Sequence, residues 1–262
     1  MALLDRFKLT DKVAIITGAG RGIGRGAALA LAEMGAHVVC AARTPEQIED
    51  TAAQARAFSV QALAVPCDVM VRAQLEHVVE TTMQRFGRID VLINNAGGTP
   101  PRPALRTSEQ MFNHAFQFNV TSAFLLTRFV VPHMNATGGG AVVNISSAAG
   151  RLVQPGFSAY GTAKAALTFM TRLLGCELAP TVRVNAIAVG ATLTDALAPF
   201  LDDTTKGQME ALTPMKRLGS VEDIALAALY LASPASSWVT GKVFEIDGGT
   251  EQTNWPFDMS AM

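Results

Sequence analysis

The chain has 262 residues, of which 49% are hydrophobic and 16% charged. This proportion of apolar side chains is enough to offset the entropy lost on folding, so a disordered protein is excluded. Lysine plus arginine (21) nearly balance aspartate plus glutamate (22), which leaves no basic excess to neutralise a phosphate backbone and makes nucleic acid an unexpected partner.

The length favours one large domain, residues 1–262, and the mean hydropathy of +0.26 suggests surface that is buried between subunits. The chain begins with charged residues, and no uninterrupted apolar stretch reaches the length of a bilayer crossing, so we expect neither a signal peptide nor a membrane partner. Three widely spaced cysteines in apolar stretches indicate a reducing compartment, the cytoplasm. None of the four histidines is near a cysteine or another histidine, so no metal site is expected.

In the first part of the chain, short β-branched runs alternate with longer helical patterns. A compact apolar strand at residues 13–17 ends in a glycine-rich turn, and apolar spacing then predicts a helix over residues 22–34. Pro45 can open the next helix at its first position, and a further helix is expected near residues 72–86. The other expected strands are residues 37–42, 62–66 and 89–94.

The same alternation continues to the end of the chain. Helices are expected at roughly residues 108–135, 160–178 and 221–231, and strands at residues 141–146, 182–188 and 243–246. The repetition without a linker predicts an α/β fold with a single parallel sheet of seven strands, covered by helices on both faces. Residues 192–219 form the least regular stretch and are interpreted as a substrate lid, because long loops in compact domains are usually functional.

Four glycines follow the first strand within seven residues: Gly18, Gly20, Gly22 and Gly24. Between a strand and a helix, such a loop lets backbone N–H groups approach an anion that the helix dipole attracts. A tight turn alone needs only one or two glycines. The spacing G-x-x-x-G-x-G, which differs from the usual G-x-G-x-x-G, therefore predicts a site for a dinucleotide pyrophosphate.

The end of the second strand predicts which dinucleotide binds. An acidic residue there would bond a ribose 2′-hydroxyl, but the sequence reads Ala41, Ala42, Arg43. Arg43 and Arg21 of the glycine loop are placed to bind a 2′-phosphate, although two solvated surface arginines are the plain alternative. The sequence thus favours NADP(H), with NAD(H) possible.

A tyrosine and a lysine, Tyr160 and Lys164, are spaced i and i+4 and share one helical face. A phenol with a pKa near 10 is a poor acid–base group at neutral pH, and a neighbouring ammonium is expected to lower that pKa. Such a pair is common by chance. Ser147, thirteen residues earlier at the end of a strand, could bond the same substrate oxygen as Tyr160, although alone it would be an ordinary turn serine.

Taken together in chain order, these motifs resemble those of the short-chain dehydrogenase/reductase family, in its single-domain branch. The resemblance runs from about Lys8 to Gly249, the expected core, and leaves residues 250–262 as a C-terminal tail. The matching segments are the glycine loop at residues 17–24, Asn-Asn-Ala-Gly at residues 94–97, Asn119, Asn-Ile-Ser-Ser at residues 144–147, the Tyr160/Lys164 pair, and Asp-Gly-Gly at residues 247–249.

The resemblance implies a Rossmann-like, doubly wound, mostly parallel sheet, a homotetramer, and a role for each matching residue. Tyr160 would exchange the proton at the substrate oxygen, Ser147 would orient that oxygen, Lys164 would bind the nicotinamide ribose and lower the tyrosine pKa, and Asn119 would hold a water of the proton relay. The implied cofactor-binding residues, besides Tyr160 and Lys164, are Gly18, Gly20, Arg21, Gly22, Ile23, Gly24, Arg43, Asp68, Val69, Asn95, Ala96, Gly97, Val189, Gly190, Thr192 and Thr194. Asp68 and Val69 would contact adenine, and residues 95–97 would line the ribose side.

One position departs from the family pattern. Val189 stands before Gly190 where the family normally has proline, in the segment expected to bracket the nicotinamide carboxamide. Losing the proline frees φ and restores an N–H, so we expect the site to survive with weaker cofactor binding.

The expected activity is hydride exchange between NADP(H) and a ketone or secondary alcohol. Apolar residues near the lid favour an apolar substrate, steroid-like or of the 3-oxoacyl type, although they could equally pack on a helix: Leu152, Phe157, Leu197, Phe200 and Met209. The alternatives are an NAD-preferring dehydrogenase and a catalytically idle redox sensor. A serine hydrolase lacks support, because G-x-S-x-G is absent. The tail, with Trp255, could cover a neighbouring subunit's cleft or fray.

Overall fold

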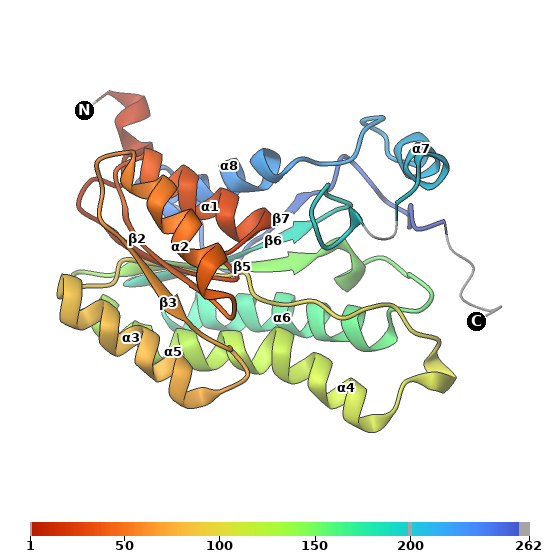
Figure 1. Cartoon of the computed structure of the whole chain (residues 1–262), viewed down its shortest axis with the longest axis horizontal. Coiled ribbons are helices and arrows are strands. Elements are labelled where there is room, and N and C mark those ends of the chain that lie inside the picture. The colour runs from red at the N-terminus through yellow and green to blue at the C-terminus, as the bar shows by residue number, and fades with distance from the viewer. Residues whose placement is uncertain (1, 199–200, 257–262) are drawn as a thin grey trace.

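The computed structural model describes residues 2–198 and 201–256, and its centre is one parallel sheet (Figure 1). The strand order is β3-β2-β1-β4-β5-β6-β7, and every pair is parallel. The strands are β1 (Val13–Thr17), β2 (His37–Ala42), β3 (Ala62–Pro66), β4 (Val91–Asn94), β5 (Gly140–Ser147), β6 (Val182–Val189) and β7 (Val243–Ile246). The carboxyl ends of all strands therefore meet at one edge of the sheet.

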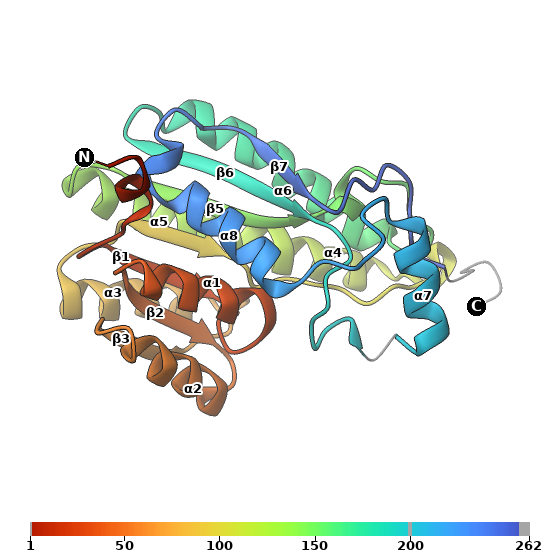
Figure 2. The same ribbon diagram turned by 90° about the horizontal axis from the view of Figure 1, so that it is seen from above.

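Helices cover both faces of this sheet (Figure 2). One face packs against α1 (Gly22–Glu33), α2 (Pro45–Arg56) and α8 (Val221–Ala232). The opposite face packs against α3 (Arg72–Phe86), α5 (Ser122–Ala136) and α6 (Ser158–Glu177). Both faces of the strands are thus buried, which explains their nearly continuous apolar sequence. Among residues 2–198 and 201–256, none of the helices combines the length and the apolar character that a bilayer crossing demands.

The α/β, Rossmann-like, doubly wound architecture predicted from the sequence is confirmed, and its topology places a crevice. The chain builds outward from β1 to β3, then crosses back so that β4 pairs with the other side of β1. At such a reversal the connections after β1 and β4 leave in opposite directions and open a gap at the carboxyl edge. The glycine loop follows β1 directly, so the fold delivers it to this crevice.

Most predicted elements begin and end within two residues of the observed ones, and the start of β4 is one boundary that moved. The strand expected at residue 89 begins at Val91, and the Asp90 side chain just before it is held by several hydrogen bonds. Its carboxylate accepts hydrogen bonds from Arg88 Nη2 at 2.6 Å and from the backbone N–H of Val13 at 3.0 Å. The ion pair with Arg88 and these hydrogen bonds hold the pKa of Asp90 below its ordinary value, against the effect of burial.

The single helix predicted over residues 108–135 is wrong in one respect. It consists of α4 (Glu109–Phe116), a π-helical turn (Gln117–Thr121) and α5. Asn119 lies in this turn, and its amide nitrogen donates to the carbonyl oxygen of Ala115 at 2.8 Å, as the backbone of an α-helix would. The turn lies within a continuous helical stretch, and the apolar pattern that predicted one helix did not reveal it.

The expected lid, residues 192–219, is more regular than the sequence suggested. It contains α7 (Asp203–Leu212), which begins where the Asp202 carboxylate accepts a hydrogen bond from Thr205 N at 2.7 Å. A backbone bridge between Thr192 and Gly219 closes the segment at its base. Phe200, one of the apolar residues expected in the lid, lies outside the described residues.

Candidate active site

A cleft of about 910 Å³ opens at the carboxyl edge of the sheet, where the topology places the crevice. Eighteen of the sequence-predicted site residues line it: Gly18, Gly20, Arg21, Gly22, Ile23, Arg43, Asp68, Val69, Asn95, Ala96, Gly97, Ser147, Tyr160, Lys164, Val189, Gly190, Thr192 and Thr194. The two that do not line it, Gly24 and Asn119, lie behind its walls and are described below. The fold therefore gathers residues from the carboxyl ends of six strands and from α6 into one cavity.

The glycine loop forms one end of this cleft. Gly18 and Gly22 have φ values of +66° and +52°, which residues with a Cβ atom rarely adopt. The loop leads into α1, whose N-terminus carries no side-chain cap in the described chain, so the N–H groups of its first turn face the cleft. Gly24 serves packing rather than lining, because a Cβ there would overlap the carbonyl oxygen of Gly18 and the amide nitrogen of Asn95.

The loop is fastened to the neighbouring strand by two polar side chains. Thr17 Oγ1 accepts hydrogen bonds from the backbone N–H groups of Asn95 and Ala96, each at 3.0 Å. The Asn95 amide donates back to the carbonyl oxygen of Thr17 at 2.9 Å. Asn95, expected on the ribose side, lines the cleft, but its side-chain amide forms the hydrogen bond that holds the glycine loop in place. This positioning role was not foreseen from the sequence.

Arg21 and Arg43 lie at the same end, on the rim of the cleft. Both side chains are exposed, and neither guanidinium forms an ion pair within the part of the chain that the structure describes. The residues that follow β2 along this rim, Thr44 and Gln47, are uncharged. Asp68 lies nearby and uses its carboxylate to accept a hydrogen bond from Met70 N at 2.9 Å. The nucleotide end of the cleft thus has two cations available to an anionic ligand.

At the other end of the cleft, β5 and α6 bring Ser147 and Tyr160 together. Ser147 is the last residue of β5, and its Oγ accepts a hydrogen bond from Ala149 N at 3.2 Å. Tyr160 lies in the first turn of α6 and is hydrogen-bonded to Ser147. The ring of Phe157, just before the helix, meets the ring of Tyr160 edge-on with centroids 5.9 Å apart.

Lys164 lies one helical turn beyond Tyr160 and is only 4% exposed. Its ammonium donates to the carbonyl oxygen of Ile145 in β5 at 2.8 Å and lies 5.7 Å from the centre of the Tyr160 ring. Burial lowers the pKa of Lys164 from 10.5 to about 8, because the charged form loses its hydration. A lysine held this way is rare in a purely structural role and indicates a functional one.

The expected lowering of the Tyr160 pKa by Lys164 is wrong for this structure. Burial raises the pKa of Tyr160 above its ordinary value, and the hydrogen bond with Ser147 opposes that effect without overcoming it. The sequence spacing correctly predicted that the two residues lie close together. It could not show that both side chains lose hydration in the fold, which disfavours the charged form of each.

Asn119 lies behind the cleft wall, where it is 2% exposed. Its Oδ1 accepts a hydrogen bond from Gly98 N at 2.8 Å. A Cβ on Gly97 would stand 2.7 Å from that same oxygen and 3.1 Å from the Lys164 ammonium, so Gly97 lies against both groups. The π-helical turn therefore brings Asn119 into the same cluster as Lys164, as the family resemblance implies.

The outer part of this end is apolar and differs from the sequence expectation. Phe157 and Leu197 line the cleft, whereas Met209 is buried outside it and Leu152 does not reach it. Trp255 of the tail lines the cleft of its own chain. Phe257, two residues later, lies outside the described residues. A tryptophan in the tail was the available signal.

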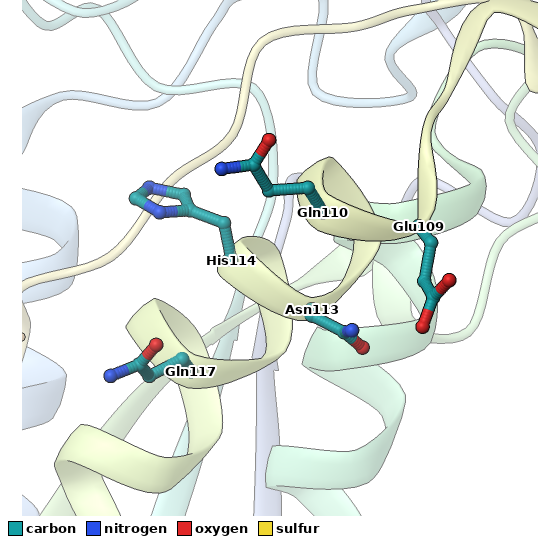
Figure 3. Close-up of a pocket in the computed structure, with 5 residues that line it drawn as sticks. All are labelled: Glu109, Gln110, Asn113, His114 and Gln117. Carbon is teal, nitrogen blue, oxygen red and sulfur yellow. The ribbon is translucent and has the colours of Figure 1, made fainter.

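A second, smaller hollow of about 450 Å³ lies on α4 (Figure 3). It is lined by polar side chains of this one helix and its extension: Glu109, Gln110, Asn113, His114 and Gln117. None of the sequence-predicted site residues lies there, and the side chains do not converge on a common point. The candidate site is therefore the large cleft.

Comparison with known proteins gives matches over nearly the whole chain. A family model described as enoyl-(acyl carrier protein) reductase matches residues 18–251. An uncharacterised oxidoreductase of Mycobacterium tuberculosis (strain CDC 1551 / Oshkosh) is 49% identical over 94% of this chain and 95% of its own. The 7alpha-hydroxysteroid dehydrogenase of Escherichia coli (strain K12) is 37% identical over 95% and 97%.

Solved structures agree with these matches. A 7 alpha-hydroxysteroid dehydrogenase complexed with NADH and 7-oxo glycochenodeoxycholic acid superimposes with a TM-score of 0.93 and 37% identity, over 97% of this chain and 99% of that one. A short-chain type dehydrogenase/reductase from Mycobacterium marinum gives a TM-score of 0.91 and 34% identity, over 95% and 99%.

Proposed function

The chain belongs to the short-chain dehydrogenase/reductase family, and we propose that it is an NADP(H)-dependent oxidoreductase that exchanges a hydride with a ketone or secondary alcohol. One observation carries this proposal. A single cleft holds a glycine loop at one end and Ser147, Tyr160 and Lys164 at the other. An anion-binding end and a proton-donating end within one cavity are what a dinucleotide-dependent reduction requires.

The residues of the nucleotide end fit a dinucleotide. The first turn of α1 offers N–H groups without a side-chain cap, which suits a pyrophosphate. Arg21 and Arg43 favour a ligand with a further phosphate on the adenosine ribose, because their guanidinium groups have no carboxylate partner among the described residues. One relative in the comparisons is complexed with NADH, which supports an NAD preference as the alternative.

The substrate end fits the proton half of the reaction. When bound, the nicotinamide supplies or takes up the hydride. In the direction of reduction, the hydroxyl groups of Ser147 and Tyr160 hold the substrate carbonyl oxygen, and the Tyr160 hydroxyl gives its proton to that oxygen as the hydride reaches the carbon. The raised pKa of Tyr160 keeps this hydroxyl protonated at neutral pH. The Lys164 ammonium, 5.7 Å from the ring, stabilises the phenolate that remains.

In the direction of oxidation the same groups work in reverse. The Tyr160 phenolate accepts the hydroxyl proton of the alcohol while the hydride leaves the carbon. Asn119, which is held against Gly98 and lies across Gly97 from Lys164, is positioned to hold a water through which the proton taken up by Tyr160 then leaves the site. The roles of Ser147, Tyr160, Lys164 and Asn119 are supported by this shared location.

The substrate that we propose is an apolar ketone or alcohol, either steroid-like and alicyclic or a 3-oxoacyl thioester. Phe157, Leu197 and Trp255 give the outer cleft an apolar lining. Relatives of both kinds support the two options, since the 3-oxoacyl-[acyl-carrier-protein] reductase of Thermotoga maritima is 36% identical over 92% of this chain. Residues 192–219 form the lid over this end.

We also propose a homotetramer in the cytoplasm. Large apolar side chains are exposed on two separate surfaces, more than isolated surface residues explain. The first surface lies on α4, α5 and α6 and contains Phe112, Phe116, Phe124, Phe169 and Leu173. The second lies on α8 and the loop before β7 and contains Leu226 and Trp238. Two such surfaces are what a tetramer assembled as a dimer of dimers needs. The three free cysteines suit a reducing compartment.

The experiment that tests the activity compares three reactions of the purified protein. NADPH and then NADH are mixed with a panel of cyclic, steroidal and 3-oxoacyl ketones, and loss of the reduced cofactor is followed by absorbance. An ester panel without cofactor serves as the control. We expect ketone-dependent oxidation of NADPH. Ester cleavage alone would overturn the proposal, and cofactor binding with no turnover of any ketone would favour the redox sensor.

A further inference from the structure

At its outer end the cleft is lined by Trp255 of the C-terminal tail of the same chain. Trp255 lines the cleft and meets the ring of Phe157 edge-on, with centroids 5.3 Å apart and an angle of 89° between the planes. Phe157 in turn meets the ring of Tyr160 edge-on at 5.9 Å. Three aromatic rings thus run in a row from the hydroxyl group at the reacting end outward along one wall.

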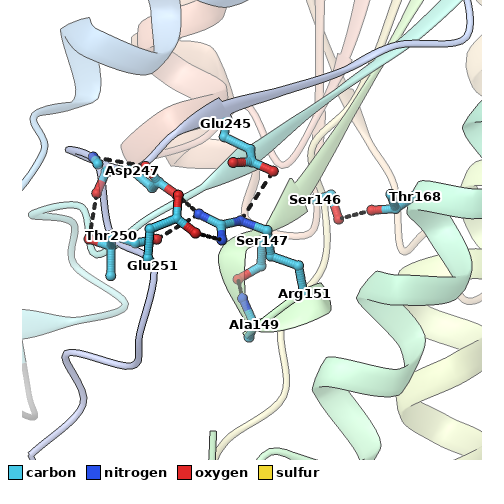
Figure 4. A network of polar contacts seen from close by, with 10 residues as sticks. Ser146, Ser147, Ala149, Arg151, Thr168, Glu245, Asp247, Thr250 and Glu251 are labelled. Atoms are coloured by element: carbon cyan, nitrogen blue, oxygen red, sulfur yellow. Dashed lines mark hydrogen bonds and ion pairs between the residues drawn. The ribbon is translucent and has the colours of Figure 1, made fainter. Parts of the chain in front are cut away.

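A single arginine holds the tail in this position. Arg151 lies four residues after Ser147 and directly after the short 3-10 helix Ala148–Gly150. Figure 4 shows its guanidinium surrounded by acceptors from the chain's end. Nη2 donates to the Asp247 carboxylate and to the Thr250 carbonyl oxygen, each at 2.6 Å, and Nη1 donates to the Glu251 carboxylate at 3.1 Å.

The strength of these contacts differs with burial. The Asp247 side chain is 5% exposed, whereas that of Glu251 is 80% exposed, so the bond to Asp247 is screened far less by water. Glu245, the last partner, lies 3.2 Å from Nε. Farther along the tail, the Asn254 amide donates to Thr213 Oγ1 at 2.9 Å and ties the tail to the lid.

The same contacts reach the wall of the cleft. Asp247 packs directly on Gly190, where a Cβ would stand 2.5 Å from the Asp247 Cα. Arg151 therefore joins three parts of the site: the turn after Ser147, the Gly190 wall and the tail that carries Trp255. Arg151 is not one of the residues that match the family motifs, because it lies between the motif that ends at Ser147 and the pair that begins at Tyr160.

We propose that Trp255 is a specificity-determining residue that selects flat ring ketones, and that Arg151 is a positioning residue that holds Trp255 in place. The inference rests on the proposed function and deepens it. A rigid aromatic wall gives a ring-shaped apolar substrate a large contact, whereas a small acyclic ketone bound at Tyr160 does not extend far enough to touch it. Between the two substrate classes proposed above, this wall favours the alicyclic one.

The first test compares two substrates in Trp255→Ala, Trp255→Phe and a control, Phe58→Ala. Phe58 is an exposed aromatic residue just after α2, outside the cleft and outside both surfaces proposed for the tetramer. For a rigid polycyclic ketone we expect Trp255→Ala to raise KM about 30-fold, with kcat within about threefold, and Trp255→Phe to recover most of this loss. For a small acyclic ketone, and for the dissociation constant of NADPH, all variants should stay within about threefold of the parent.

The second test reads the tail without turnover. In a Trp238→Phe background, Trp255 is the remaining tryptophan, because the chain has two. Adding Arg151→Gln is expected to shift its emission to longer wavelength and to increase quenching by acrylamide, and Arg151→Lys should restore part of the parent spectrum. The matched control is Arg56→Gln, since Arg56 also joins a carboxylate (Glu49) and a backbone carbonyl (Ala62) but lies at the opposite edge of the sheet.

The outcomes separate the two claims. If the parent protein turns over none of the tested ketones with NADPH, the proposed function is overturned, and the selective role of Trp255 with it. An active parent whose preference for the polycyclic ketone survives Trp255→Ala overturns the specificity role alone. An Arg151→Gln spectrum identical to that of the Arg56→Gln control overturns the positioning role, whatever the activity.

Discussion

At its nucleotide end the cleft takes one wall from the backbone of a continuous segment, residues 18–23, whereas at its substrate end it is lined by side chains from distant segments. The first end uses glycines, free N–H groups and two exposed arginines. The second uses Ser147 from β5, Tyr160 and Lys164 from α6, and Trp255 from the tail. The two ends also differ in hydration, since Lys164 is 4% exposed.

This difference shows how one fold separates binding from proton transfer. A pyrophosphate carries charge and is held by dipoles and cations that remain partly in water, which costs little desolvation. Proton transfer needs groups whose pKa values differ from those in water, and burial among packed side chains is one way to provide that. Variants at the two ends should therefore fail differently, the first in affinity for the nucleotide and the second in rate.

The largest effect is expected from Tyr160→Phe. Removal of the hydroxyl that carries the proton should lower kcat about 10³-fold while the dissociation constant of NADPH stays within about threefold. The matched control is Tyr230→Phe, because Tyr230 is the other tyrosine and packs against Phe7 and Phe244 away from the cleft. Steady-state kinetics and fluorescence titration measure the two quantities. Full activity of Tyr160→Phe would remove the basis of the proposed function.

The pH dependence of stability tests the burial of Lys164. Its folded-state pKa of about 8 lies below the ordinary 10.5, so between these pH values the unfolded state binds more protons and raising the pH stabilises the folded state. Relative to Lys164→Met, the parent should gain roughly 3 kcal/mol in free energy of unfolding between pH 7 and pH 10.5. Most of this gain should occur between the two pKa values, about 8 and 10.5. Urea denaturation at each pH measures this.

The control for Lys164 is Lys8→Met, at an exposed lysine paired with Asp5. The difference in free energy of unfolding between Lys8→Met and the parent should not change in the same direction between pH 7 and pH 10.5. A pH-independent difference between the parent and Lys164→Met would show that the ammonium is hydrated in the folded state, and that the substrate end is not drier than the nucleotide end.

Gly24→Ala tests the backbone construction of the nucleotide end. A Cβ there would overlap the Gly18 carbonyl oxygen and the Asn95 amide, so α1 must move away from the glycine loop. We expect NADPH affinity to fall about 100-fold, by loss of the N–H groups of the first turn. Gly207→Ala in α7 is the control, since nothing lies within 4 Å of its Cβ position. Calorimetric titration that finds equal affinities would contradict this construction.

Arg43→Ala tests which nucleotide is preferred. Loss of one charge-assisted hydrogen bond to a 2′-phosphate should weaken NADPH binding about 10- to 30-fold and leave NADH binding unchanged. Arg72→Ala removes an equally exposed arginine, paired with Glu76 on α3, and should change neither. Equal effects on both nucleotides would favour the NAD-preferring alternative.

The smallest effect is expected at Val189. The residue sits in β6 between Ser147 of β5 and Ile246 of β7, where the family pattern has proline. Val189→Pro fixes φ and should tighten NADPH binding at most about fivefold, with kcat nearly unchanged. Val184→Ala, a change elsewhere in the same strand, controls for general effects on β6. A large change in rate at constant affinity would show that this position belongs to the reacting end.

The sequence predicted the nucleotide end more completely than the substrate end. The glycine loop is one uninterrupted segment between a strand and a helix, so its shape follows from local rules about φ and helix N-termini. The Tyr160/Lys164 pair was also local, because two residues four apart on a helix share a face. The positioning role of Asn95 and the tail's place in its own cleft depend on contacts between segments far apart in the chain, which no local pattern contains.

The sequence by itself determined the strands, the helices, the parallel sheet and the order in which the site residues occur, because periodicity and turn chemistry act over a few residues. Only the tertiary structure decided the π-helical turn at Asn119, the place of Trp255 beside Phe157, and the upward shift of the Tyr160 pKa. The physical reason is that burial is a sum over neighbours from the whole fold. A side chain's loss of water, and with it the cost of its charge, is fixed only when distant segments pack around it.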